Sequence, residues 1–243
     1  VVEVRSAPDA DRAVLDAEPG DLLELAAGRA WLRLEEPYPR AGSSPTGSGN
    51  RLWRAVSHHS EPATADRADI TGVAAVAARY GRPISYGYLA DRYPLRDYQT
   101  VFGHRPGSAE MPSAARPFTP ELVTRLVSHG IAVAPVTLHT GVSSQEAGEA
   151  PQPERFSVGR STAAVVNAAR AAGGRVIAVG TTVTRALESA VETAGSGPRL
   201  VATGGWTDRV ISPADPPRVV DGLITGWHDP EASHLLLVEA VAG

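Results

Sequence analysis

The sequence predicts an α/β protein in which a largely parallel sheet carries most of the chain and a smaller antiparallel β region precedes it. Three observations predict this class. Residues 1–60 contain short strand patterns with turn residues between them. Residues 119–172 alternate helix, strand and helix, and residues 173–190 pass from a β-branched strand through a tight loop into a helix. Because such alternation normally gives parallel strands with right-handed crossovers, we expect a parallel sheet.

The length and composition are those of an ordinary globular protein. The chain has 243 residues, of which 42% are hydrophobic and 21% charged. We expect two domains, an antiparallel β domain over residues 1–60 and an α/β domain over residues 61–243. No run approaches about eighteen apolar residues, and charged residues are spread through the amino-terminal segment in place of a signal-peptide core. These features indicate a soluble, cytoplasmic protein without a membrane partner.

Two residue types are absent from the sequence, and their absence excludes several chemistries. There is neither cysteine nor lysine, so all 23 basic residues are arginine. Disulfides, thiolate catalysis, cysteine metal sites and lysine Schiff bases are therefore excluded on this chain. The net charge of −4 does not attract phosphates, so any contact with nucleic acid must use a local arginine cluster.

The best candidate for such a cluster is the stretch from Arg79 to Arg105. It holds five of the six tyrosines, interleaved with arginines. Interleaved Arg and Tyr side chains stack on bases and hold phosphates in nucleic-acid-binding proteins. The alternative is an irregular segment that packs amphipathic side chains over a domain edge, and the sequence leaves both interpretations open.

The amino-terminal elements are short strands. Residues 1–5 and 51–57 each predict a strand, and residues 20–38 predict two more, with turns at Gly20-Asp21 and Gly28-Arg29. Residues 41–50 are small and polar, which is typical of a surface loop. Four such strands form part of a small barrel or sheet and leave an open edge.

A helix opens the middle of the chain. Thr119 is its expected N-cap, Pro120 and Glu121 occupy its first turn, and Gly130 ends it. A buried strand is predicted over residues 131–138, and a second helix over residues 161–172, closed by two glycines.

The next segment, residues 173–190, is where we expect a ligand to bind. Residues 175–179 predict a strand, and the helical period begins at Thr184. The loop between them would lie at the carboxyl end of a parallel strand, where backbone N–H groups and the helix dipole favour ligands. The alternative is structural: Thr182 caps the helix, and Arg185 and Glu188 form a surface pair.

The carboxyl-terminal segment predicts one more helix. It is apolar, and Asp229 and Pro230 are its expected cap and first-turn residues. His228, Glu231 and His234 are spaced three apart, but this spacing does not focus three side chains on one point. We therefore expect no metal site.

Six blocks of sequence, taken together, resemble one known family. They are DYQTVF at 97–102, GSAEMPSAARPFT at 107–119, VTLHTG at 136–141, GGRVIAVGTTVTRALES at 173–189, GWTD at 205–208 and VDGLITGWHDPEASHLLLVEAVAG at 220–243. Their order and spacing resemble the S-adenosylmethionine:tRNA ribosyltransferase-isomerase family of queuosine biosynthesis. The resemblance is strong over residues 80–243 and weak over residues 1–60.

The resemblance implies an enzyme that transfers and isomerises the ribosyl moiety of S-adenosylmethionine. The acceptor would be a 7-aminomethyl-7-deazaguanine base in tRNA, adenine and methionine would leave, and the product would be epoxyqueuosine. S-adenosylmethionine is then a substrate, and no metal is implied. The family's fold is a barrel-like α/β domain with a smaller antiparallel β-barrel. We expect its amino-terminal portion to be absent here, in keeping with Val1 and a partial barrel.

The implied chemistry needs a base. A sulfonium acidifies its neighbouring carbon, so a positioned base can remove a proton there and start the loss of adenine. His139, at the end of a predicted strand, is the candidate, and Glu110, Asp208 and His228 are alternatives. A hydrogen-bonded structural role for His139 also stays open.

Other residues are expected to bind the substrates. Thr181 and Thr182 would line the ribose, and Arg185 would hold the methionine carboxylate through its bidentate geometry. Tyr98 and Trp206 would stack adenine or the acceptor base, the alternative being core packing. The full expected set is Tyr98, Gln99, Ser108, Arg116, Phe118, Thr137, Thr181, Thr182, Arg185, Trp206 and Thr225.

Three departures from the family pattern fall in the expected site loops. Arg116-Pro117 replaces a histidine region, residues 141–154 keep Glu154 but lose a histidine, and Glu231 replaces a lysine. Losing basic residues weakens phosphate binding. Two other functions therefore stay open. One is a same-fold enzyme that uses S-adenosylmethionine on a small-molecule acceptor or cleaves it without tRNA, and the other is a non-catalytic nucleoside-binding protein.

Overall fold

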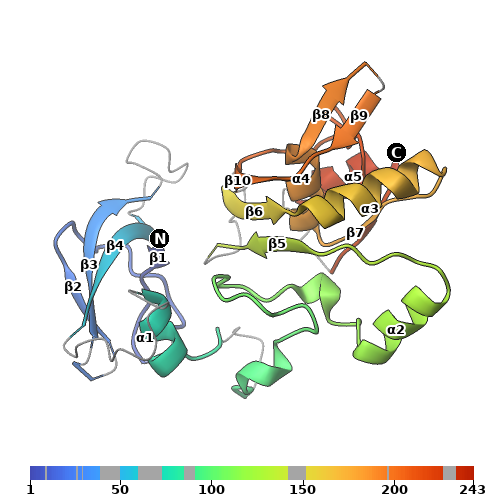
Figure 1. Cartoon of the computed structure of the whole chain (residues 1–243). Coiled ribbons are helices and arrows are strands. Elements are labelled where there is room, and N and C mark those ends of the chain that lie inside the picture. Colours follow the sequence, from blue (N-terminus) through green and yellow to red (C-terminus); the bar gives the residue numbers. More distant parts are fainter. Residues whose placement is uncertain are drawn as a thin grey trace. The chain divides into compact units, whose positions relative to one another are not determined.

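The computed structural model describes residues 1–8, 10–25, 27–28, 30–38, 50–59, 73–84, 91–141, 152–195, 197–226 and 234–243. The chain divides into two compact units, residues 1–98 and residues 99–243 (Figure 1). The domain boundary predicted at residue 60 falls outside the described ranges, so that division stays a prediction. Within these ranges, no helix has the length and apolar character needed to cross a membrane.

The first unit is built on an antiparallel sheet, which confirms the prediction for its strands. The strand order is β1-β4-β3-β2, with β1 and β2 at the two edges. The turn before β2 has Gly20 at φ +97°, a conformation that glycine adopts without strain. The elements of this unit are β1 (Val2–Glu3), β2 (Leu22–Leu25), β3 (Ala30–Pro37), β4 (Leu52–His59), α1 (Val73–Tyr80) and the one-turn helix η1 (Leu95–Asp97).

Trp53 of β4 is at the centre of the core of the first unit. Its side chain is buried in a cluster with Leu34 of β3 and Val4, and its indole N–H donates to the carbonyl of Asn50 (3.1 Å). Burial alternates along β3, which is the period of a strand with one face toward a core. The sheet therefore has one apolar face and one polar face.

The second unit combines helices with several small sheets. Three strands form a sheet in the order β10-β6-β5, β11 pairs with β7, and β8 pairs with β9. The elements are η2 (Ser113–Ala115), α2 (Pro120–Ser128), β5 (Val136–His139), β6 (Glu154–Val158), α3 (Arg160–Ala171), β7 (Ile177–Val179), α4 (Thr181–Ser189), β8 (Val191–Ala194), β9 (Gly197–Leu200), β10 (Thr203–Thr207), β11 (Gly222–Ile224) and α5 (His234–Ala242).

The mixed α/β class is confirmed, but the expectation of a largely parallel sheet is wrong. Within the described part of the second unit, β7 and β11 run parallel, whereas the β5–β6, β6–β10 and β8–β9 pairs are antiparallel. The reason is β6, a strand that the sequence analysis does not predict. Without β6 the order β5-α3-β7 resembles a parallel crossover unit. With β6 present, β5 and β6 follow one another along the chain and pair directly, and strands paired in this way normally run antiparallel.

The helices α2 and α3 lie close to their predicted positions, whereas α1 was not predicted and α4 begins at Thr181, three residues before the predicted start. α2 begins after Thr119, whose hydroxyl accepts a hydrogen bond from the N–H of Leu122 (3.1 Å), and Gly130 follows the helix at φ +80°. α3 agrees with the predicted range within one residue at each end. The strand predicted over residues 131–138 is shorter than expected, because its first residues are exposed and only β5 pairs.

The strand before the predicted ligand loop is confirmed as a parallel strand. Asp221 holds the start of the β7–β11 pair, since its carboxylate accepts from the N–H of Val176 (2.7 Å) and its own N–H donates to the Val176 carbonyl (2.8 Å). At the other end, the N–H of Gly180 donates to the carbonyl of Ile224 (2.8 Å). The loop therefore does lie at the carboxyl end of a parallel strand.

The core of the second unit lies between its sheets and helices. α4 packs against β5, β6 and β7. The buried apolar cluster comprises Phe156, Val158, Ala163, Val166, Val176, Ala178, Ala186, Leu187, Ala190, Leu200, Val219 and Val220.

Candidate active site

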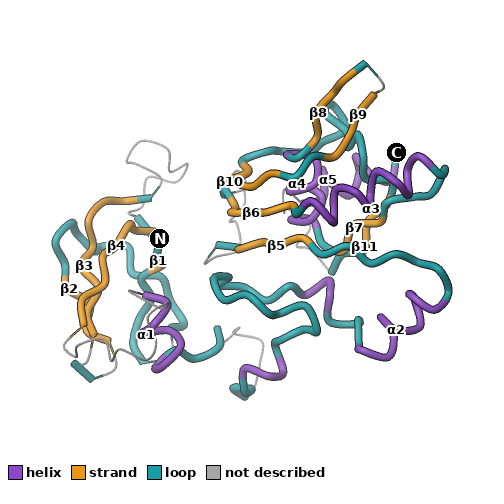
Figure 2. Tube along the Cα trace, in the orientation of Figure 1, coloured by secondary structure: helices purple, strands orange, loops and turns teal. Residues whose placement is uncertain are grey.

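The loop between β7 and α4 is crossed by a second segment of the chain. Figure 2 shows residues 99–119 as loop interrupted by the one-turn helix η2. The side chain of Ala114 in η2 lies against Gly180, where a Cβ would be 3.9 Å from it, and Ser113 lies close to Gly226 after β11. Two blocks that are distant in the sequence therefore meet at the carboxyl ends of β7 and β11.

Arg185 of α4 joins several segments around this loop. Its side chain is only 4% exposed. The Nη1 group donates to Glu154 Oε2 (2.5 Å), the Nη2 group to the carbonyls of Gln152 (3.1 Å) and Thr207 (3.2 Å), and Nε to the carbonyl of Arg209 (2.8 Å). These bonds use four of its five N–H groups. Arg185 thus ties the starts of β6 and α4 to the end of β10.

Glu154 is the partner that completes this cluster. Its second carboxylate oxygen accepts from the hydroxyl of Thr182 (3.3 Å), so Thr182 bonds Glu154 rather than capping α4, which begins after Gly180. Burial raises the pKa of Glu154, and the Glu110 carboxylate raises it further, while Arg185 and Thr182 oppose the shift. We call Glu154, Thr182 and Arg185 the buried cluster.

Two of the expected catalytic acids lie near the buried cluster. Glu110 interacts electrostatically with Glu154, and Asp208 interacts with Arg185. Burial lowers the pKa of the Arg185 guanidinium, and the two carboxylates of Glu154 and Asp208 oppose that shift. The structure therefore brings Glu110 and Asp208 to the same group of charges.

Glu188 does not pair with Arg185, so the expected surface pair is wrong. Glu188 is fully buried, and its Oε1 accepts from the backbone N–H groups of Val219 (2.8 Å) and Val220 (3.1 Å). Its other oxygen lies 3.5 Å from Nε of Arg218. Glu188 instead holds the segment that leads into β11.

Ser108 attaches the loop segment to the free edge of β5. Its hydroxyl donates to the carbonyl of Leu138 and accepts from the N–H of Thr140, both at 3.3 Å. The N–H of Ala109 donates to the Thr140 carbonyl, and the Thr140 hydroxyl donates to the carbonyl of Glu110. Residues 108–110 therefore run along the end of β5 as an additional partner.

His139 lies beside this segment, at the end of β5. Its ring packs against Gly107, where a Cβ would be 2.5 Å from Nδ1, and Gly107 has a φ of +141°. Partial burial lowers the pKa of His139, and the charges of Arg155 and Arg105 lower it further. Its Nδ1 atom is buried and has no hydrogen-bond partner among the described residues. The ring is therefore held largely neutral near neutral pH.

His139 and the buried cluster lie on opposite faces of the β10-β6-β5 sheet. Glu154 shares a face with the buried Phe156, because residues two apart on a strand point the same way. Arg155 points to the other face, and the strand register places His139 and Trp206 on either side of it. The structure thus brings Thr182 and Arg185 together, and it places His139 and Trp206 on the other face, on either side of Arg155. Residues 107–110 connect the two groups.

The remaining expected residues are distributed over several parts of the structure. Thr137 lies on the same face as His139, opposite Ser157, and Thr225 follows β11 next to the parallel pair. Phe118 packs on Phe102, with ring centroids 6.0 Å apart. Arg116 is exposed after η2, Gln99 packs over Gly103, and Thr181 is buried at the start of α4. His228 lies outside the described residues.

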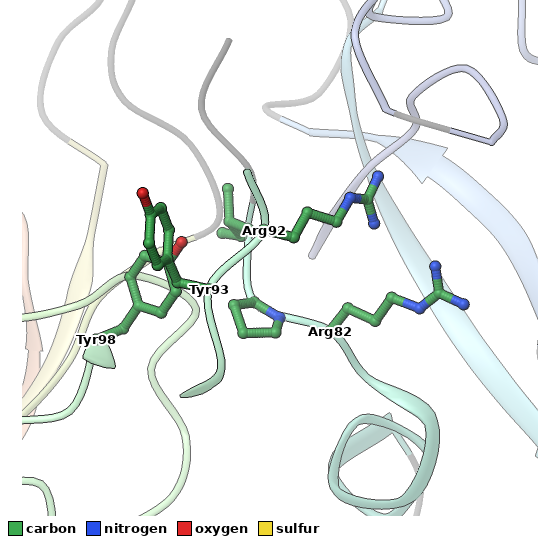
Figure 3. A pocket seen from close by; sticks show the side chains of 6 residues that line it. Arg82, Arg92, Tyr93 and Tyr98 are labelled. Atoms are coloured by element: carbon green, nitrogen blue, oxygen red, sulfur yellow. The ribbon is translucent and has the colours of Figure 1, made fainter. Parts of the chain in front are cut away.

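Tyr98 belongs to a cavity in the first unit. The cavity has a volume of about 120 Å³ and is lined by Arg82, Pro83, Ile84, Arg92, Tyr93 and Tyr98. Figure 3 shows the rings of Tyr93 and Tyr98 at one end, with the guanidinium groups of Arg82 and Arg92 extending away from them. The interleaved Arg and Tyr residues therefore line a common cavity, as both interpretations of this stretch allow.

Glu154 was expected in a site loop but not as one of the catalytic or substrate-binding residues. Two features of the sequence point to Glu154. It is retained in the segment 141–154, where the histidine of the family pattern is lost, and polar and apolar residues alternate after it in Arg155, Phe156, Ser157 and Val158. That alternation predicts a strand that directs Glu154 inward. For metals, no group of three or more His, Asp or Glu side chains in the described ranges is arranged to hold an ion.

Comparisons with known proteins agree with the sequence blocks. The sequence profile of the family described as "Queuosine biosynthesis protein" matches residues 39–243. The S-adenosylmethionine:tRNA ribosyltransferase-isomerase of Acaryochloris marina is 44% identical over 153 residues, which are 60% of this chain and 40% of that protein. The enzyme of the same name from Thermus thermophilus is 40% identical over 162 residues, 64% of this chain and 46% of that protein.

A solved structure is also similar. It is the S-adenosylmethionine tRNA ribosyltransferase of Thermotoga maritima, with 35% identity, a TM-score of 0.43, and coverage of 54% of this chain and 41% of that one. The chain spans about half the length of the curated relatives it matches. Because the profile covers most of the sequence, including every element of the candidate site, this chain belongs to the queuosine biosynthesis protein family.

Proposed function

We propose that this protein transfers and isomerises the ribosyl moiety of S-adenosylmethionine onto a 7-aminomethyl-7-deazaguanine base in tRNA. Adenine and methionine leave, and the RNA carries epoxyqueuosine. The observation that carries the proposal is the profile match over residues 39–243, supported by relatives named for this reaction at about 40% identity. The reaction on tRNA places the protein in the cytoplasm. In this proposal residues 1–60 belong to the smaller β-barrel and residues 61–243 to a barrel-like α/β domain.

In this proposal the donor binds where the loop segment crosses the ends of β7 and β11. Thr181, Thr182 and Thr225 offer hydroxyls to the ribose, and Ser108, Arg116 and Phe118 come from the crossing segment. Arg185 keeps one N–H on Nη1 without an acceptor among the described residues, and that N–H is available to the methionine carboxylate. Its other bonds make Arg185 a residue that also positions Glu154 and Thr182.

The proposed base is His139. Because His139 and the buried cluster lie on opposite faces of the β10-β6-β5 sheet, the donor in this proposal extends around residues 107–110 at the end of β5, with its sulfonium beside the His139 ring and its carboxylate toward Arg185. A neutral imidazole accepts the proton from the carbon next to the sulfonium, and the sulfonium stabilises the electron pair left there. The lowered pKa of His139 supports this role because it keeps the ring unprotonated near neutral pH. That electron pair forms a double bond to the adjacent ring carbon, whose bond to the ring oxygen breaks and opens the ribose. The freed oxygen becomes a carbonyl as the carbon–nitrogen bond to adenine breaks, and adenine takes up a proton. Glu110, Asp208 and His228 remain the alternatives, and no metal takes part.

The acceptor base and its loop are proposed to use the aromatic and polar residues outside the buried cluster. Thr137 lies on the same strand face as His139, and Trp206 is exposed on β10, on the other side of β6. Tyr98 and Gln99 lie within the Arg and Tyr stretch. Aromatic side chains stack on unpaired bases in many RNA-binding proteins. The partners in this proposal are thus S-adenosylmethionine and tRNA.

The test measures adenine release from S-adenosylmethionine by chromatography, with and without tRNA that carries the aminomethyl precursor base. Release that requires the precursor tRNA supports the proposal. Equal release without tRNA would show donor cleavage or use of a small acceptor, and tight donor binding without release would show a nucleoside-binding protein. Either of these two outcomes contradicts the proposal.

A further inference from the structure

One face of the β10-β6-β5 sheet carries an aromatic ring and a cation side by side. Trp206 of β10 is 70% exposed, the largest exposed fraction among the large apolar side chains that the structure describes. Arg155 of β6 lies directly opposite Trp206 in the strand register and is also exposed. It forms no hydrogen bond or ion pair with another described residue. We call the exposed side of these strands the tryptophan face.

The neighbours of Trp206 leave room for a flat ligand. Gly204 is the next residue on the same face of β10, two positions away, and has no side chain to cover the indole. The next positions on this face are Ser157 of β6 and Thr137 of β5, which carry hydroxyl groups. The surroundings of the ring are therefore polar, which disfavours an apolar protein surface or a lipid layer as the occupant.

Arg155 supplies a positive charge on this face. Arg155 and Arg105 both lower the pKa of His139, so both guanidinium groups lie near its ring. Glu110 and Asp208 interact with the charges of the buried cluster, Glu110 with Glu154 and Asp208 with Arg185. An exposed ring beside the Arg155 guanidinium matches a nucleotide, which offers a flat base and a phosphate.

We propose that the tryptophan face binds an unpaired stretch of RNA, with a base stacked on Trp206 and the neighbouring phosphate held by Arg155. The RNA must be unpaired because a base in a duplex does not expose its flat surface to a side chain. This proposal rests on the proposed function for the identity of the RNA as a tRNA loop. It assigns Trp206 to the acceptor and not to the adenine of the donor.

The test measures binding of a fluorescein-labelled RNA hairpin with an unpaired loop by anisotropy, in the absence of S-adenosylmethionine. Trp206→Ala should weaken binding about ten-fold, and Trp206→Phe should restore most of it, because stacking needs only an aromatic ring. Arg155→Gln should weaken binding and make it less dependent on salt by about one counterion. Arg175→Gln, at an exposed arginine before β7, is the matched control and should leave binding unchanged.

Several outcomes would overturn the proposal. Equal binding by the wild type and Trp206→Ala would remove the stacking role, and equal binding of a fully paired RNA of the same length would remove the preference for a loop. Dissociation of a dimer by Trp206→Ala, seen by sedimentation, would instead show a contact between copies.

RNA binding is measured without turnover. Loss of adenine release with intact loop binding therefore contradicts the proposed function and leaves the tryptophan face in place. If Trp206→Ala still modifies precursor tRNA with an unchanged KM for tRNA, the proposed function stands and the RNA-binding role of the tryptophan face is contradicted.

Discussion

Glu154 and Arg155 are consecutive residues of β6, and their side chains lie on opposite faces of the same sheet. Glu154 points inward to Arg185, and Arg155 points outward between His139 and Trp206. Adjacent positions on β6 therefore face two different environments. One is the buried charge cluster next to the loop, and the other is the exposed face with a histidine and an aromatic ring. Residues 107–110 contact both sides.

Arg185→Ala should lower the free energy of unfolding by about 3–5 kcal/mol, the cost of leaving a buried carboxylate without its partner. The variant also leaves the carbonyls of Gln152, Thr207 and Arg209 without their donor. Urea titration followed by circular dichroism measures the change. The control is Arg175→Ala, an exposed arginine for which we expect less than about 0.5 kcal/mol. A stability loss for Arg185→Ala no larger than the control would contradict its role as a tie between segments.

Glu188→Ala should cost about 2–3 kcal/mol, because it removes the acceptor of two buried backbone N–H groups, those of Val219 and Val220. Glu188→Gln keeps a side-chain oxygen and should recover part of the loss. Thermal or urea unfolding measures both variants, with the exposed Glu192→Ala as the control. Equal stability of Glu188→Ala and Glu192→Ala would rule out the structural role.

The proposed base predicts a specific pH dependence. Adenine release should fall on the acid side with an apparent pKa below 6.5, because burial and two arginines favour the neutral ring of His139. Arg155→Gln removes one of these cations, so the pKa rises and the acid limb moves to higher pH. The pH profile of kcat/KM for the wild type, Arg155→Gln and the control Arg175→Gln measures this. An acid limb that stays in place, or that moves to lower pH, would argue against His139 as the base.

Gly107→Ala should displace the His139 ring and slow adenine release at least ten-fold, because the new Cβ would lie 2.5 Å from Nδ1. Gly130→Ala is the control for backbone strain: Gly130 also has a positive φ, of +80°, but nothing lies within 4 Å of its Cβ position. It should lose some stability and keep its activity. Activity of folded Gly107→Ala equal to that of Gly130→Ala would show that the ring position does not matter.

Local signals in the sequence were sufficient for α2, α3 and the ligand loop, but not for α1. Thr119, Pro120 and Gly130 define α2 by capping chemistry alone, and the change of period around Gly180 locates the β7–α4 loop. Such signals depend only on neighbouring residues. The resemblance to the queuosine family rests on blocks of this kind, and the profile match confirms it.

Strand pairing and partner choice were beyond the sequence. The short strand β6 was not predicted. Because β6 pairs with both β5 and β10, the strands of that sheet run antiparallel and not parallel. Arg185 and Glu188 are one helical turn apart, which predicts a surface pair, yet each bonds residues more than twenty positions away. Long-range partners of buried charges follow from tertiary packing, which a local pattern does not contain.

Analysis of the RNA product tests the central claim most directly. Precursor tRNA is incubated with the protein and S-adenosylmethionine, digested to nucleosides and examined by mass spectrometry, while free adenine is measured in the same sample. The account predicts epoxyqueuosine in the RNA and one adenine released for each base modified. Adenine released while the RNA stays unmodified would contradict it.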